Sequence, residues 1–259
     1  NKDKYDSWQD YIYYGGLPHI LAEDKEIDKV RYLNHLNKEI YLRDICERYG
    51  VSNPDGMEVL LKIIASSIGS LTNPQKISDT FKSNNQNGIS MPTINNYLSF
   101  LQESFILQKA DRYNVKGRKY ISTPSKYYYT DIGLRNALLN FRQVEETHIM
   151  ENIIYNELIL RGYNVDVGVV EINCTESGKH MRKQLEVDFV ANLGNKRYYI
   201  QSAFSIADQT KMEKEKSSLI KIPDSFKKII IVAGNSKIWR NDDGITIMNI
   251  LDFLLNFNS

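Results

Sequence analysis

The sequence lacks the features that mark secreted and membrane-spanning proteins. It holds 2 cysteines, Cys46 and Cys174, whose wide separation excludes a disulfide framework or a cysteine-rich zinc site. No apolar run approaches the roughly 20 residues of a membrane helix. The polar start, NKDKYDSWQD, has no hydrophobic signal-peptide core. These absences predict a cytoplasmic protein with reduced thiols and no membrane partner.

A nucleotide-binding loop and a strong charge of one sign are missing too. The motif G-x-x-x-x-G-K-[ST] has no match, because SGKH at 177–180 lacks the first glycine and the final Ser or Thr. The chain is therefore not expected to bind or hydrolyse ATP by itself. Its net charge is +1, and residues 51–140 are the basic part, with 10 Lys or Arg against 6 Asp or Glu.

Hydrophobic periodicity and turn signals divide the chain into three segments. Residues 1–52 contain an amphipathic helix from about Lys25 to Tyr49, which Gly50 is placed to end. Residues 53–140 read as three helices followed by two strands, the order of a winged helix-turn-helix domain. Residues 141–259 mix helices and strands, which predicts an α/β domain with a small mixed sheet. The fold class is thus a multi-domain α/β protein.

The middle segment has a surface suited to DNA. Its third helix, capped by Ser90, offers Thr93, Asn95 and Asn96 to a groove. The two strands and their loop form a basic wing suited to phosphate contacts. Its cations are Lys109, Arg112, Lys116, Arg118, Lys119 and Lys126. The recognition helix has no Arg or Lys, so a protein-interaction module with a solvated wing remains the alternative.

The last segment contains a candidate catalytic hairpin. If Gly194 and Asn195 form a two-residue turn, Leu193 pairs with Lys196. Strict alternation then places four residues of the two strands on one face. These are Glu186, Asp188, Gln201 and Ala203, and the other face carries Leu185, Val187, Phe189, Tyr198 and Ile200.

A further carboxylate lies on the helix predicted over residues 148–161. Glu151 shares an apolar stripe with Ile154 and Leu158, where a charge is costly unless it is paired or bound to a metal. Glu151 and Asp188, with Gln201, are therefore predicted ligands of Mg²⁺, which prefers a few oxygen ligands completed by water and phosphate. The alternative is a buried hydrogen-bonded network that serves only structure.

These residues resemble the PD-(D/E)XK nuclease-like superfamily. A glutamate on a helix, EVD on a strand and IQSA on the next strand follow the order of that plan. The resemblance places Ala203 where the catalytic lysine belongs, and Gln201 where a carboxylate is usual. Loss of the cation removes a large electrostatic contribution to phosphoryl chemistry. The resemblance therefore implies a degenerate site, with an active Mg²⁺-dependent nuclease as the alternative.

A wider resemblance covers almost the whole chain. YYGGLP, KYYYTDIGLRNALL, MENIIYNEL, EVDFV and DGITIMNILDFLL are similar, in this order, to the C-terminal half of a large prokaryotic group of AAA-type ATPases. That group joins a nucleotide-binding domain to a winged helix and a nuclease-like domain of unknown function. The resemblance implies that this chain is a fragment without its ATP-binding module. It would bind DNA, a protein partner or a second copy of itself.

Overall fold

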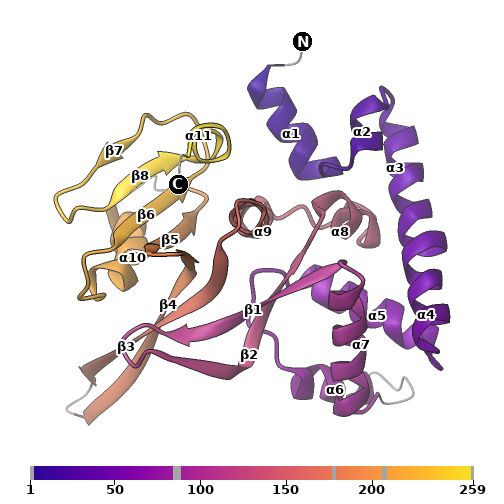
Figure 1. Cartoon of the computed structure of the whole chain (residues 1–259), viewed down its shortest axis with the longest axis horizontal. Coiled ribbons are helices and arrows are strands. Elements are labelled where there is room, and N and C mark those ends of the chain that lie inside the picture. Colours follow the sequence, from indigo (N-terminus) through magenta and orange to yellow (C-terminus); the bar gives the residue numbers. More distant parts are fainter. Residues whose placement is uncertain (1–2, 84–88, 177–178, 206–208, 258–259) are drawn as a thin grey trace. The chain divides into compact units, whose positions relative to one another are not determined.

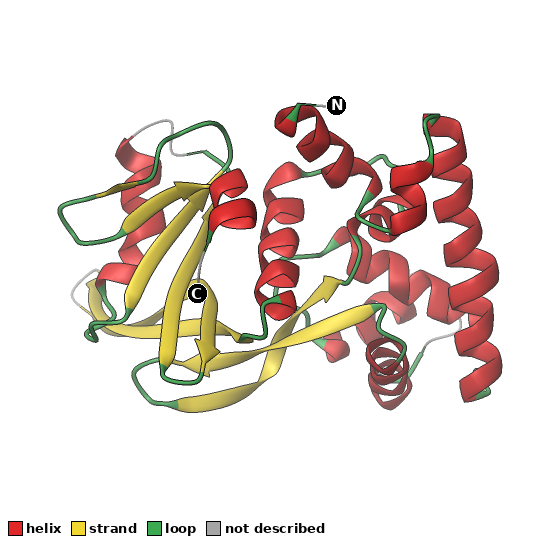
Figure 2. Ribbon diagram, turned by 45° about the horizontal axis from the view of Figure 1, so that its top comes forward, coloured by secondary structure: helices red, strands yellow, loops and turns green. Residues whose placement is uncertain are grey.

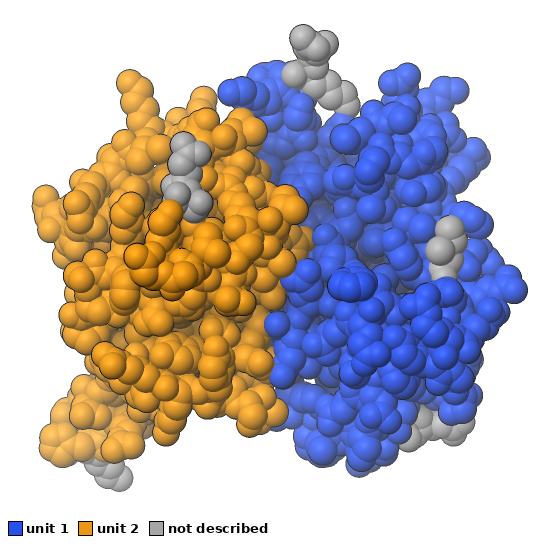
Figure 3. Space-filling view, in the orientation of Figure 1, with its two compact units in different colours: residues 1–109, 126–152 blue, residues 110–125, 153–259 orange. Residues whose placement is uncertain are grey.

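A computed structural model describes residues 3–83, 89–176, 179–205 and 209–257. The chain forms two compact units, coloured separately in Figure 3. Unit 1 comprises residues 1–109 and 126–152, and unit 2 comprises residues 110–125 and 153–259. These units are compact parts of the structure, whereas the three predicted segments were drawn from sequence pattern. The bounds of the segments therefore stay a prediction.

Unit 1 is mostly helical (Figure 2). The amphipathic helix predicted from Lys25 to Tyr49 is confirmed, but its middle is wound differently. It runs through α3 (Glu26–His35), the π-helical η1 (Leu36–Leu42) and α4 (Arg43–Tyr49). Gly50 ends it with φ at 60°, a left-handed conformation that glycine adopts freely. Two shorter helices precede it, α1 (Lys4–Tyr14) and α2 (Pro18–Ala22).

The three predicted helices of the middle segment are present as α5 (Pro54–Ser66), α6 (Pro74–Ser83) and α7 (Met91–Glu103). The Ser90 side chain accepts a hydrogen bond from the Thr93 amide, so the predicted helix cap is confirmed. The inner face of α7 is buried through Ile94, Tyr97, Leu98 and Leu101. The order of helices and strands is as predicted, and a winged helix-turn-helix stays a prediction.

Two short motifs far apart in sequence meet in unit 1. Asp131 caps α8 (Ile132–Leu138) by accepting from the Leu134 amide at 3.0 Å, and its other oxygen accepts from the Gly16 amide at 2.9 Å. The Asn136 side chain donates to the carbonyls of Ile12 and Tyr13 at 2.8 and 2.9 Å. The end of α1 is therefore fixed against the start of α8 by hydrogen bonds.

In the part of the chain that the structure describes, the strands form one mixed sheet of eight in the order β2-β1-β3-β4-β5-β6-β8-β7 (Figure 1). They are β1 (Leu107–Asn114), β2 (Lys119–Tyr129), β3 (Asn164–Glu176), β4 (Lys179–Leu193), β5 (Lys196–Ala203), β6 (Lys227–Val232), β7 (Trp239–Arg240) and β8 (Thr246–Asn249). The prediction of a small sheet is wrong for two reasons. Strand β1 of the predicted wing pairs in parallel with β3, Arg112 opposite Val167. Residues 247–249, which the sequence pattern places at the start of a last helix over 247–257, pair with β6 instead.

Helices cover both faces of the sheet in unit 2. On one face, Leu219 of α10 (Gln209–Ile220) joins a core cluster with sheet residues such as Val187 and Tyr199. On the other face, Tyr155 of α9 (Glu146–Leu160) lies 6.2 Å from the ring of Phe189, and α11 (Ile250–Asn256) also packs there. No helix within the described ranges is long and apolar enough to cross a membrane.

Candidate functional site

Strand β4 carries an extra residue at the predicted acidic site. Asp166 pairs with Val190 and Gly168 pairs with Val187, so Val167 of β3 alone stands opposite Asp188 and Phe189. This is a β-bulge, which locally breaks the alternation of side chains along a strand. Bulges often lie next to active sites, where they redirect a side chain.

The bulge overturns part of the predicted arrangement of faces. The two-residue turn is confirmed, because Leu193 pairs with Lys196. Val187 and Ala203, however, belong to the same core cluster against α10, although they were expected on opposite faces. Phe189 packs against α9 on the other face. Strict alternation fails because the extra residue in β4 moves the side chains on one side of the bulge to the opposite face of the sheet.

Asp188 is buried and held by backbone and side-chain groups of β5. Its Oδ2 accepts from the Ser202 amide at 2.8 Å, and its own amide donates to Gln201 Oε1 at 3.4 Å. Gln201 is also hydrogen-bonded to the carboxylate of Glu215 on α10. Asp188 and Gln201 therefore meet as predicted, while Glu186 is half-buried on the same strand.

Glu215 is a site residue that the sequence interpretation missed. Burial raises the pKa of its carboxyl group, and the hydrogen bond from Gln201 opposes that shift. Met212 and Leu219 lie three and four residues from it, and both contribute to the core cluster. A carboxylate on an apolar stripe is the signal that identified Glu151, and it applies equally to Glu215.

The raised pKa of Glu215 predicts a pH effect. A carboxyl group with a raised pKa favours the folded state below its ordinary pKa of about 4.3, and this contribution is lost as pH rises through the raised value. Glu215→Gln should therefore gain thermal stability relative to wild type between pH 4 and pH 7, by about 1–2 °C. Asp242→Asn, at an exposed site of the same unit, is the control. A Tm difference that does not change with pH would contradict the prediction.

Glu151 is the centre of a buried polar cluster in unit 1. Its Oε1 accepts from Lys126 Nζ at 2.9 Å and from the Tyr128 hydroxyl at 2.7 Å. Lys126 is 2% exposed and Glu151 is 7% exposed. Lys126 was expected among the basic residues of the wing, and that expectation is wrong. Its side chain neutralises a buried carboxylate instead of reaching solvent.

Of the predicted Mg²⁺ ligands, Glu151 belongs to unit 1 and Asp188 belongs to unit 2. An oxygen of each already accepts hydrogen bonds from protein groups. Within residues 3–83, 89–176, 179–205 and 209–257, no three His, Cys, Asp or Glu side chains gather as a metal ion would require. The Mg²⁺ site stays a prediction.

The residues predicted to contact DNA are mostly accessible. On α7, Asn95 and Asn96 are exposed and Thr93 is half-buried. Lys109, also in unit 1, is exposed. In the β1–β2 hairpin of unit 2, Lys116, Arg118 and Lys119 are exposed, whereas Arg112 is half-buried and donates to the Gln184 side chain at 2.9 Å.

The sequence interpretation missed two further cations beside that hairpin. Lys116 Nζ donates to the Glu171 carbonyl at 3.1 Å, and Glu171 pairs with Gln184 across β3 and β4. The next two residues of β4, Lys183 and Arg182, are exposed. The hairpin turn and the outer half of β3–β4 thus carry five exposed cations, here called the basic patch: Lys116, Arg118, Lys119, Arg182 and Lys183. Arg182 and Lys183 are consecutive on β4, so they extend from opposite faces of the sheet.

This is the architecture of an α/β protein with a mostly helical unit 1 and a mixed sheet in which Asp188 lies at a β-bulge. Residues 5–145 match the family described as Domain of unknown function (DUF8612). The match covers more than half of the chain, and the chain belongs to this family.

Two longer proteins are similar to the chain over most of its length. An uncharacterized protein of Haemophilus influenzae is 33% identical over 248 residues, which are 96% of this chain and 58% of that protein. The uncharacterized protein MJ1544 of Methanocaldococcus jannaschii is 29% identical over 206 residues, 80% of this chain and 43% of that protein. The chain therefore spans about half the length of the curated relatives it matches.

A solved structure also aligns with the chain. The crystal structure of protein VC1899 from Vibrio cholerae has 14% sequence identity and a TM-score of 0.30, over 86% of this chain and 53% of that one. Similarity at this level supports no conclusion about function.

Proposed function

We propose that the chain is the non-catalytic C-terminal region of an AAA-type ATPase and that it binds double-stranded DNA. The basic patch of unit 2 is the observation that carries the DNA part of this proposal. Its cations come from two neighbouring pairs of strands, and those that share a face of the sheet can contact consecutive phosphates. The ATPase part rests on the resemblance of motif order, and the greater length of the relatives leaves room for such a module.

Unit 1 offers a second surface that fits the same ligand. The N-terminal half of α7 exposes Asn95 and Asn96, while its opposite face is buried. Asparagine amides can read adenine in a major groove. The helix itself carries no cation, so it would contribute sequence preference and little affinity.

The loss of catalysis is proposed from the surroundings of Ala203. This residue is 3% exposed within an apolar core cluster, where a charged lysine would have to be desolvated. The competing function is an active Mg²⁺-dependent nuclease, which the bulge at Asp188 favours because bulges often adjoin active sites.

The proposal predicts that Lys116→Glu combined with Arg118→Glu weakens DNA binding more than tenfold, because two phosphate contacts become repulsive. Binding is measured by gel shift with a labelled duplex at several salt concentrations. The slope of log affinity against log salt concentration should become less steep by about 2. The control combines Lys221→Glu with Lys237→Glu, which makes the same charge change at exposed sites of unit 2.

Two results would overturn the proposal. Equal affinity of both double variants for the duplex would mean that the basic patch does not contact phosphate. Nicking of plasmid in Mg²⁺ or Mn²⁺ that disappears in Asp188→Asn would replace the non-catalytic region with the nuclease.

A further inference from the structure

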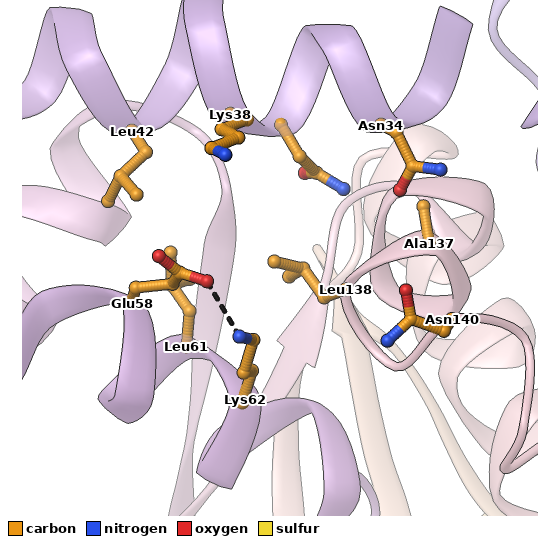
Figure 4. A pocket seen from close by; sticks show the side chains of 10 residues that line it. Asn34, Lys38, Leu42, Glu58, Leu61, Lys62, Ala137, Leu138 and Asn140 are labelled. Carbon is orange, nitrogen blue, oxygen red and sulfur yellow. Dashed lines mark hydrogen bonds and ion pairs between the residues drawn. The ribbon is translucent and has the colours of Figure 1, made fainter. Parts of the chain in front are cut away.

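Unit 1 contains a pocket of about 270 Å³ that none of the functions considered so far uses. Its walls come from α3 and η1 on one side, α5 on the second and α8 on the third (Figure 4). Figure 4 shows Lys38 and Leu42 extending from one wall toward Glu58 and Leu61 on another. The pocket is therefore formed by side chains of different kinds on facing helices.

The π-helical segment η1 supplies part of this wall. Asn37, Lys38 and Leu42 all belong to η1, and Asn34 precedes it by one residue in α3. A π-helix is wider than an α-helix and rare, and the π-helical turns that do occur are frequently at functional sites. An α-helix here would point these side chains in other directions. The π-helical backbone therefore helps to shape the pocket.

The pocket is lined by two lysines and one glutamate, which gives it one excess positive charge. Lys62 Nζ contacts Glu58 Oε1 at 2.6 Å, so these two side chains neutralise each other. Lys38 lines the same pocket and makes no ion pair with any residue in the described parts of the chain. A ligand with a single negative charge would complete the charge balance.

Amide side chains add hydrogen-bonding groups. The Asn37 Nδ2 donates to the Leu134 carbonyl at 2.8 Å, which orients the amide and leaves its Oδ1 as an acceptor for a ligand N–H. Asn34 and Asn140 lie on two sides of the pocket, and each offers both a donor and an acceptor. Such groups are complementary to a peptide-like amide.

An apolar surface and the volume complete the description. Leu42, Leu61 and Leu138 provide a site for an aliphatic group. A cavity of about 150 Å³ accepts benzene, which has about 6 non-hydrogen atoms. By that ratio, the 270 Å³ pocket accommodates about 11 such atoms.

We propose that this pocket binds an N-acylated aliphatic amino acid. Lys38 would contact the carboxylate, the asparagine amides the acyl amide, and the leucines the aliphatic side chain. The same chemistry occurs in a small metabolite and at the carboxyl terminus of a peptide.

The probe is N-acetyl-leucine, titrated into the full chain and followed by NMR shifts of the asparagine side-chain amides. We expect saturable shifts with a Kd of roughly millimolar size, as befits a ligand of about 12 non-hydrogen atoms. N-acetyl-leucinamide, which has no carboxylate, should bind at least about tenfold more weakly, because it lacks the charge-assisted bond. Lys38→Met should weaken binding of N-acetyl-leucine by a similar factor.

Lys25→Met, an exposed lysine at the start of α3 and outside the pocket, is the matched control and should bind as wild type does. The absence of saturable shifts would overturn the proposal, as would equal binding of the acid and the amide. Unchanged binding in Lys38→Met would also overturn it. Acetyl-Gly-Gly-Leu then identifies the source: tighter binding than N-acetyl-leucine supports a peptide terminus, and weaker binding supports a free metabolite.

Discussion

Replacing Glu151 by leucine is expected to lower the free energy of unfolding of unit 1 by about 3–5 kcal/mol. The buried ammonium of Lys126 would lose a carboxylate that it contacts at 2.9 Å, and the Tyr128 hydroxyl would lose an acceptor at 2.7 Å. Lys126→Met should cost a similar amount, because it leaves the Glu151 charge in the same apolar surroundings. The double replacement should cost less than either single one, since it leaves neither charge in the interior.

The measurement uses the positions of the two tryptophans. Trp8 lies in α1 of unit 1, and Trp239 lies in β7 of unit 2. In a Trp239→Phe background, fluorescence during urea unfolding reports on unit 1 through Trp8 alone. The four members of the double-mutant cycle are compared in that background.

An exposed ion pair provides the matched control. Arg43 Nε and Glu47 Oε1 are also 2.9 Å apart, but both side chains are more than 65% exposed. Their replacement by Met and Leu should cost less than about 0.5 kcal/mol. If the effects of Lys126→Met and Glu151→Leu simply add, the two groups are not energetically coupled and the description of the cluster is wrong.

Gly133→Ala is expected to destabilise unit 1 by about 3 kcal/mol or more, a large effect for one methyl group. A Cβ atom at this position would lie 2.0 Å from the Tyr14 carbonyl oxygen, which is backbone and cannot rotate away. The end of α1 would have to separate from α8, breaking the bonds from Gly16 to Asp131 and from Asn136 to Ile12. An alanine in an open helical position would instead be favourable by up to about 1 kcal/mol.

Trp8 again provides the probe, because it lies in the helix that must move. Gly50→Ala is the control for backbone strain alone: φ is positive at Gly50, and nothing lies within 4 Å of the added Cβ. It should cost about 1 kcal/mol. A Gly133→Ala variant as stable as Gly50→Ala would show that α1 does not approach α8 as closely as described.

Local signals in the sequence were reliable where the cause of the structure is local. Ser90 caps α7 and Gly50 ends α4, because each depends on hydrogen bonds or dihedral angles within one turn. The turn at Gly194 and Asn195 fixed the pairing of Leu193 with Lys196 for the same reason. The predicted meeting of Asp188 and Gln201 followed from that turn.

Pairing between distant strands limited the rest of the prediction. Nothing near Asp188 in the sequence marks the bulge, since it arises from the register of β4 against β3, whose partners lie on a separate strand. The parallel contact between β1 and β3 likewise joins residues more than fifty positions apart, so the predicted wing became part of a large sheet. The partner of Glu151 was missed because Lys126 was counted among the cations of the basic wing, although it lies in the buried part of β2.

The sequence by itself determined the class of secondary structure, the order of most elements, the helix ends and the presence of carboxylates on apolar stripes. These follow from periodicity, composition and backbone preferences over a few residues. The tertiary structure alone decided which groups donate hydrogen bonds to those carboxylates, on which face of the sheet Val187 and Ala203 lie, and the pocket beside η1. Each of these depends on segments brought together from distant parts of the chain, where burial and register outweigh local preference.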